Sequence, residues 1–124
     1  MTGFIVFAHG SRVESANDAV RAVSAQLAEL GSHVVEPAFL ELGQPDLAAA
    51  VGRLAERGAD RIVVLPYFLT LGTHMQRDLP RLVAAASARY GNVQITVAPP
   101  LDGHPALVSA LMDRAESALN GGVR

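Results

Sequence analysis

Two long apolar runs constrain the fold of this chain most strongly, because each of them leads to a histidine. The first run spans residues 4–8 and is followed by His9; the second spans residues 62–69, and His74 comes five residues later. Both runs are continuous in Val, Ile and Phe, which is typical of strands buried on both faces of a parallel sheet. Ligands bind at the carboxyl ends of such strands, so we expect a site at that edge.

Four strands and four helices are expected to alternate along the chain. Strands are expected at about residues 3–8, 33–40, 62–68 and 93–98, and helices at about 14–30, 45–58, a segment ending near 90, and 104–120. The short connections predict a three-layer α/β fold, a four-stranded parallel sheet with helices on both faces. Right-handed crossovers favour the strand order 2-1-3-4 in one domain over residues 1–124. In that order the first and third strands are neighbours, so His9 and His74 are expected to converge.

Local signals refine the boundaries of these elements. Ser15 with Asp18 three residues later resembles a capping signal for the first helix. Pro37 favours an edge strand or a bulge for the second strand, and Pro45 is predicted at the first position of the second helix. Pro80 either begins the third helix or lies inside one that starts earlier; the sequence leaves both open.

Composition excludes several classes of function. The 124-residue chain has no cysteine and no lysine, and its formal net charge is -2. Thiolate metal sites and Schiff-base catalysis are therefore excluded, and non-specific nucleic-acid binding is disfavoured. No apolar run approaches the roughly 20 residues that a membrane span needs. The beginning of the chain carries no basic segment of a signal peptide, and we expect a cytoplasmic protein.

Four charged or imidazole side chains are expected at the carboxyl edge of the sheet, namely His9, Glu41, His74 and His104. His33 precedes its strand and is expected at the opposite edge, as a surface residue. A carboxylate beside two neutral imidazoles suits a divalent first-row cation. Simpler interpretations remain open, with Glu41 as a solvated loop charge and His104 as a helix cap.

Residues next to the two main histidines could bind a substrate. Gly10 allows a ligand or a backbone segment to approach closely, and Ser11 adds a hydrogen-bonding group. Arg12 and Arg77 each follow a histidine by three residues and could bind an acidic substrate through the planar guanidinium. The alternative is that both arginines are ordinary surface residues.

A strand followed by His9-Gly10 is also similar to the Arg-His-Gly opening of histidine phosphatases. In those enzymes the arginine holds the phosphate, and here Ala8 occupies its position. Phosphoryl transfer with His9 as nucleophile is therefore the less favoured interpretation. The chain contains no G-x-G-x-x-G, P-loop, G-x-S-x-G or H-E-x-x-H motif.

Taken together, the motifs resemble those of one known family. Strand-His9-Gly10-Ser11-Arg12, the segment 65–69 and the segment 72–80 (GTHMQRDLP) are similar to the short class II chelatases, the small CbiX-type and SirB-type sirohydrochlorin chelatases. The resemblance extends over essentially the whole chain, including residues 39–41 and the predicted helix start at Pro45.

The resemblance implies insertion of Co2+ or Fe2+, with Ni2+ also possible, into sirohydrochlorin without ATP and without a permanently bound cofactor. It implies that His9 and His74 bind the metal and accept protons, in a homodimer, on a path to cobalamin or sirohaem. An imidazole with an ordinary pKa of about 6.5 can do both near neutral pH. A non-catalytic metal or tetrapyrrole carrier on the same fold is the alternative.

Overall fold

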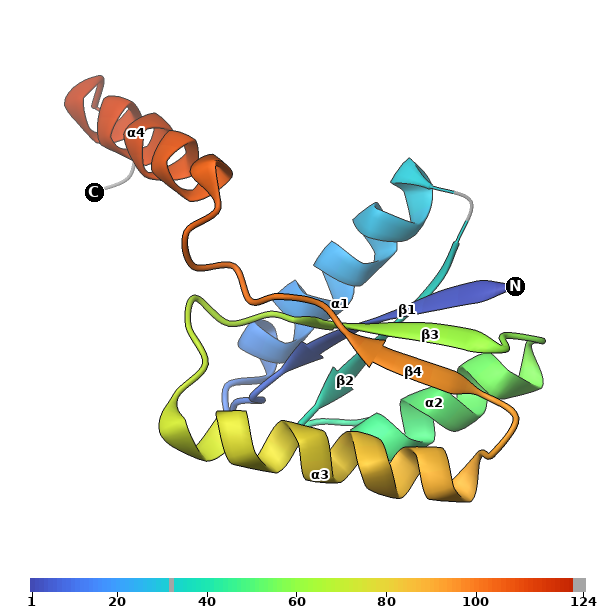
Figure 1. The fold of residues 1–124 in the computed structure, drawn as a ribbon. Coiled ribbons are helices and arrows are strands. Elements are labelled where there is room, and N and C mark those ends of the chain that lie inside the picture. Colours follow the sequence, from blue (N-terminus) through green and yellow to red (C-terminus); the bar gives the residue numbers. More distant parts are fainter. Residues whose placement is uncertain (32, 122–124) are drawn as a thin grey trace.

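The computed structural model describes residues 1–31 and 33–121. Its elements alternate along the chain as expected (Figure 1): β1 (Thr2–Ala8), α1 (Glu14–Leu30), β2 (Val34–Phe39), α2 (Leu47–Glu56), β3 (Arg61–Pro66), α3 (Thr73–Arg89), β4 (Gln94–Val97) and α4 (Pro105–Leu119). The strands form a parallel sheet in the order β2-β1-β3-β4. The predicted α/β class and strand order are confirmed, and β2, with its Pro37, is an edge strand.

The apolar runs form the two central strands because these strands are covered on both faces. In β1, Ile5 and Phe7 pack into one cluster, and Val6 and Ala8 pack into another. β1 and β3 pair in register, with Phe7 opposite Pro66. The segments that carry His9 and His74 therefore leave the same edge of the sheet from adjacent strands.

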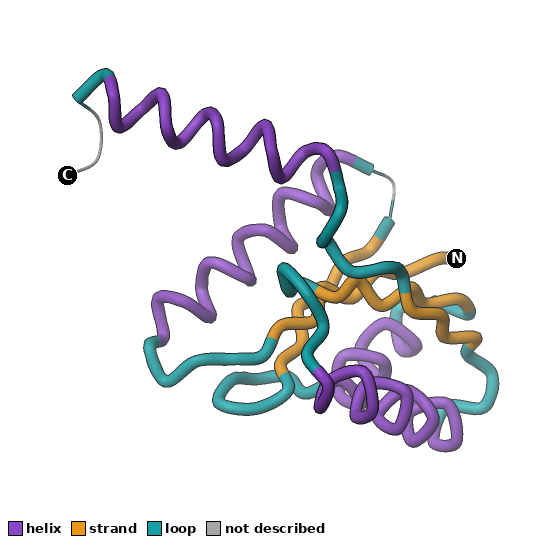
Figure 2. Tube along the Cα trace, turned by 60° about the vertical axis from the view of Figure 1, so that its left-hand side comes forward, coloured by secondary structure: helices purple, strands orange, loops and turns teal. Residues whose placement is uncertain are grey.

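Helices cover the two faces unequally. Figure 1 shows α2 and α3 together beneath one face, whereas α1 alone lies against the other. Both views show α4 leading away from the sheet, beyond the end of β4 (Figure 2). No residue of α4 is buried, although its apolar positions predict a packed face.

Helix starts differ from the sequence predictions in two places. Val13 occupies the N-cap position of α1 without a side-chain hydrogen bond, so the predicted Ser15–Asp18 capping signal is wrong. α2 begins at Leu47 rather than at Pro45, because the Asp46 carboxylate accepts a hydrogen bond from the Ala49 amide at 2.9 Å and caps the helix there.

Two boundaries in the second half of the chain are also settled. Pro80 lies inside α3, which decides between the two interpretations in favour of the earlier helix start. β3 ends at Pro66, before the predicted Phe68, but the Tyr67 amide still donates to the Phe7 carbonyl at 2.8 Å. No helix among the described residues is long and apolar enough to cross a membrane.

Candidate functional site at the carboxyl edge of the sheet

His9 is the first residue after β1, and its side chain lies beside that of Glu41. Nε2 of His9 lies 3.8 Å from Oε1 of Glu41, and both side chains are more than half exposed. Backbone hydrogen bonds create this pair, because the Glu41 amide donates to the His9 carbonyl at 3.1 Å, just beyond the end of the β1–β2 pairing. Nδ1 of His9 lies 3.4 Å from the Gly10 carbonyl oxygen. A carbonyl only accepts, so a proton on Nδ1 leaves the Nε2 lone pair free beside the carboxylate.

Gly10 makes this close approach possible. Its φ of +95° lies in the left-handed region that other residues rarely adopt. A Cβ atom at this position would overlap the carbonyl oxygen of Glu41. Glycine is therefore required here for both conformation and space, and the prediction of a close backbone approach at Gly10 is confirmed.

Asn17, in the first turn of α1, connects the loop after β1, which contains His9, with the loop after β2. Its side chain is 1% exposed. Oδ1 accepts from the Ser11 amide at 2.9 Å, and Nδ2 donates to the carbonyls of Ser11 and Leu42, each at 2.9 Å. Asn17 was not among the predicted site residues; the available signal was an asparagine on the expected buried side of a helix, close to the motif.

Arg21, Glu14 and Asp18 form an ion-pair network next to Asn17. Arg21 donates to Glu14 at 2.7 Å and to Asp18 at 2.8 Å, and its guanidinium lies 5.2 Å from the centre of the Phe39 ring. The hydrogen bond from Arg21, followed by that from Asn17, lowers the pKa of Glu14, and the bond to Glu14 raises the pKa of Arg21. Glu14 therefore stays ionised beside the loop.

His74 lies in the first turn of α3, at the end of the loop that leaves β3. Its ring is exposed, and Nδ1 lies 3.2 Å from a terminal nitrogen of Arg77, one turn further along the helix. A guanidinium only donates, so Nδ1 accepts in this contact. Arg77 also lies 3.5 Å from Asp78. Gly72 caps α3 without a side-chain hydrogen bond.

The other candidate residues occupy different environments. Nδ1 of His104 accepts from the Ala106 amide at 3.0 Å and caps α4, as the simpler interpretation had it. His33 is exposed at the opposite edge, as predicted, and its ring packs against that of Phe4 in a tilted arrangement, with 4.5 Å between the ring centres. Ser11 Oγ accepts from the Val13 amide at 3.0 Å, which leaves its hydroxyl proton available. Arg12 is exposed beside it.

The three predicted metal-binding side chains do not form one cluster in a single chain. Over residues 1–31 and 33–121, no group of three histidine, aspartate or glutamate side chains is close enough to hold an ion. His9 and Glu41 form a pair, and His74 stands apart with Arg77. The arrangement supplies two separate imidazoles at one edge of the sheet rather than a closed metal cage.

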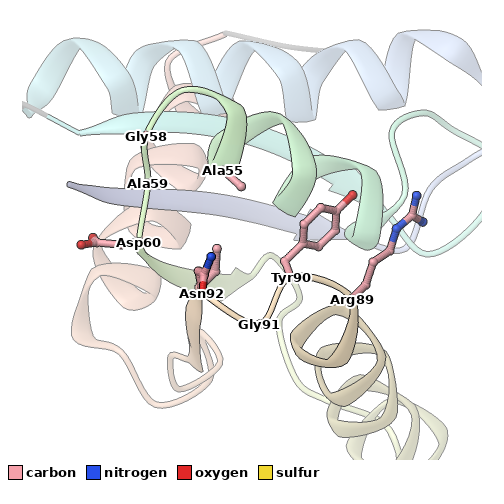
Figure 3. A pocket seen from close by; sticks show the side chains of 9 residues that line it. Ala55, Gly58, Ala59, Asp60, Arg89, Tyr90, Gly91 and Asn92 are labelled. Atoms are coloured by element: carbon pink, nitrogen blue, oxygen red, sulfur yellow. The ribbon is translucent and has the colours of Figure 1, made fainter.

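A pocket of about 370 Å3 at the amino edge of the sheet is distinct from this site. Figure 3 shows Asp60, Arg89 and Tyr90 around it, where α2 and α3 end. Asp60 is bound to the N-terminal ammonium group at 3.0 Å, which lowers its pKa. None of the predicted site residues lines this pocket, and we do not associate it with the histidines.

Comparison with known proteins identifies the family. Residues 3–118 match the CbiX family. The chain is 33% identical over 119 residues to the chloroplastic sirohydrochlorin ferrochelatase of Arabidopsis thaliana, covering 95% of this chain and 53% of that protein. It is also 33% identical over 126 residues to the sirohydrochlorin cobaltochelatase of Saccharolobus solfataricus, covering 97% and 98%.

A solved structure shares the fold. The sirohydrochlorin chelatase SirB of Bacillus subtilis subspecies spizizenii, solved in complex with cobalt, matches with a TM-score of 0.87 and 28% identity, over 94% of this chain and 50% of SirB. The chain thus spans about half the length of SirB and of the plant relative, and nearly all of the archaeal one. Because residues 3–118 match the family and the archaeal relative is 33% identical over 97% of this chain, the chain belongs to the CbiX family.

Proposed function

We propose that this protein is a sirohydrochlorin chelatase that inserts Co2+ or Fe2+ into the tetrapyrrole without ATP. One observation carries the proposal: two exposed imidazoles, His9 with Glu41 and His74 with Arg77, occupy the carboxyl edge of two adjacent strands. The relatives named above as sirohydrochlorin cobaltochelatase and ferrochelatase support the same activity. Ni2+ is a further candidate metal, and no permanently bound cofactor is needed.

The reaction requires proton acceptors more than it requires a tight metal site. Metal insertion removes two pyrrole N–H protons while the hydrated cation loses water. Neutral imidazoles accept protons near neutral pH and bind first-row cations without the strong hold of thiolates. In our proposal His9 accepts one proton through Nε2, and the Glu41 carboxylate stabilises the resulting imidazolium at 3.8 Å.

His74 requires one extra step, because Arg77 occupies its Nδ1 atom. While the guanidinium donates to Nδ1, that nitrogen can accept neither a proton nor a metal. The substrate carries several carboxylates, and a guanidinium binds a carboxylate more strongly than it binds a neutral imidazole. We therefore propose that a substrate carboxylate draws Arg77 away and exposes His74 as the macrocycle arrives.

The remaining candidates contribute to binding. Arg12 and the Ser11 hydroxyl are available to bind substrate carboxylates beside His9, and Gly10 allows the Glu41 backbone to lie against this loop. His104 caps α4 through Nδ1, so a proton on Nε2 is left for a substrate oxygen. Residues 1–124 form one chelatase-like lobe in this proposal, two lobes pair as a homodimer, and a cytoplasmic location stays a prediction.

The decisive experiment is metallation of sirohydrochlorin, followed by visible absorbance, with Co2+, Fe2+ and Ni2+ in parallel. The wild-type protein should turn over many equivalents, whereas a carrier would stop at one. His9→Ala and His74→Ala should each lower kcat/KM at least about 100-fold, the contribution of a general base. His33→Ala, at the opposite edge of the sheet, is the matched control and should behave as wild type.

The proposal fails if both histidine variants retain full activity while their circular dichroism and unfolding curves match those of the wild type. Loss of activity in His33→Ala to the same extent would also overturn it, because that result would assign the effect to general destabilisation rather than to the carboxyl edge.

A further inference from the structure

Leu42, the residue after Glu41, has a backbone conformation that leucine rarely adopts. Its φ is +57°, and over residues 1–31 and 33–121 it is the one residue other than glycine with a positive φ. A Cβ atom crowds the backbone in this left-handed region, which favours glycine or asparagine. Gly43 follows directly but supplies space rather than this conformation, because a Cβ there would lie 2.9 Å from the Phe39 ring. A position suited to glycine or asparagine therefore carries a leucine.

The side chain of Leu42 gives the fold little in return for this strain. The residue is 50% exposed, and it belongs to neither of the two hydrophobic clusters of the lobe. An apolar side chain that stays in water contributes little to folding. Single exposed leucines are common on protein surfaces, but here exposure coincides with an unfavourable backbone conformation. The combination indicates a role other than stabilising the folded chain.

Hydrogen bonds around Leu42 hold the strained conformation in place. The amide of Glu41, the preceding residue, donates to the His9 carbonyl at 3.1 Å. The buried Asn17 side chain donates to the carbonyl of Leu42 itself at 2.9 Å. Strained residues persist only where the surrounding structure fixes them, and they cluster at functional sites. Leu42 is thus fixed directly beside the His9–Glu41 pair.

We propose that Leu42 is a substrate-contacting residue, whose exposed side chain packs against the ring system of the tetrapyrrole beside His9. The assignment rests on the function proposed above. A tetrapyrrole presents a broad apolar face as well as carboxylates, and Ser11 and Arg12 in the neighbouring loop are polar groups that suit the carboxylates. Leu42 supplies the apolar contact, and its side chain leaves water only when the substrate is bound.

Leu42→Asn separates a role in binding from a role in folding, because asparagine tolerates a positive φ and offers no apolar side chain. The variant should keep the Tm of the wild type or raise it by about 4 °C. The Kd of metal-free sirohydrochlorin, from absorbance titration, and its KM at fixed Co2+ should each rise about tenfold. The KM for Co2+ should stay unchanged, because a leucine side chain does not bind cations.

Two further variants are the controls. Leu42→Met keeps an apolar side chain of similar volume and should retain a Kd within about twofold of the wild type. Leu30→Asn makes the same replacement at a leucine that is 85% exposed at the end of α1, and it should leave Kd and KM unchanged.

Three results would overturn the inference. A normal Kd and KM in Leu42→Asn would show that the side chain does not contact the substrate. A lowered Tm in that variant would show that Leu42 stabilises the fold instead. A changed mass in solution by light scattering would assign its exposed side chain to contact between copies of the chain.

Metal-free sirohydrochlorin distinguishes failure of this inference from failure of the proposed function. A wild-type protein that binds the macrocycle but does not metallate it lacks the proposed activity, and a tenfold higher Kd in Leu42→Asn would still support the contact. A wild-type protein that does not bind sirohydrochlorin overturns both.

Discussion

The two histidine loops at the carboxyl edge are built in different ways. His9 follows β1 in a loop that is held by hydrogen bonds from the buried Asn17 side chain. Gly10 allows this loop to lie against the backbone of Glu41. His74 sits on the exposed first turn of α3, where its main polar contact is with Arg77 on the same helix. One imidazole is thus held by the core of the fold and the other by its own helix. We infer that His9 supplies a fixed position and His74 an adjustable one.

Replacing one glycine in each loop by alanine should give the largest difference between the His9 loop and the His74 loop. Gly10→Ala places a Cβ against the Glu41 carbonyl at a φ of +95°, so either the loop or the β2 end must move. We expect a loss of about 3–4 kcal/mol in the free energy of unfolding, together with most of the metallation activity. Urea unfolding and the sirohydrochlorin assay measure the two effects.

Gly72→Ala is the matched change in the other loop. A Cβ at Gly72 meets no atom within 4 Å, and its φ of -70° is ordinary. The expected cost is about 1 kcal/mol or less, since glycine is only a modest N-cap. Equal losses in the two glycine variants would contradict the distinction between a fixed and an adjustable loop.

Removing the hydrogen bonds of Asn17 tests whether they hold the His9 loop in place. Asn17→Ala leaves the Ser11 amide and the carbonyls of Ser11 and Leu42 without their buried partner. We expect a loss of about 2–3 kcal/mol in unfolding free energy, with a larger fall in kcat than in substrate binding. Ser24→Ala, which removes one buried hydrogen bond to Val20 in the same helix, should cost about 1 kcal/mol and leave kcat unchanged.

How far the sequence predicts this site depends on the range of the interactions involved. Continuous apolar runs and helical spacing are local patterns, and they predict the strand order and bring His9 and His74 to one edge. The hydrogen bond from Asn17 to the Leu42 carbonyl joins residues 25 positions apart. The position of Asn17 on the buried side of the helix is a local signal, but no local pattern identifies Leu42 as its partner. α4 shows the same limit, because its amphipathic spacing predicts a buried face, whereas none of its residues is buried in this structure. The predicted start of α2 was wrong for a third reason. Pro45 and Asp46 are both suitable residues for a helix start, and the hydrogen bond from the Ala49 amide to Asp46 determines which of them precedes the first helical residue.

In the adjustable His74 loop, we expect the largest effect on substrate binding from a change at Arg77. Arg77→Gln removes the guanidinium from His74 and from the proposed substrate carboxylate. We expect KM for sirohydrochlorin to rise about tenfold, equivalent to about 1.4 kcal/mol, with little change in stability because the side chain is exposed. Steady-state kinetics at fixed Co2+ measure the change. A normal KM would show that Arg77 does not hold the substrate.

The smallest expected effect is on the pH dependence of the unfolding free energy, through Glu14 on the fixed His9 side. Hydrogen bonds from Arg21 and Asn17 lower the pKa of Glu14 below its ordinary value. A carboxylate with a lowered pKa in the folded state adds stability above its ordinary pKa of about 4.3, and this stability is lost as the pH falls through the lower folded pKa. Glu14→Gln should therefore flatten the decline of unfolding free energy between about pH 5 and pH 3 without moving the plateau near pH 7 by much, because the side chain is exposed. An acid response of Glu14→Gln identical to that of the wild type would contradict an electrostatic contribution of Glu14 to the stability of the fixed His9 side.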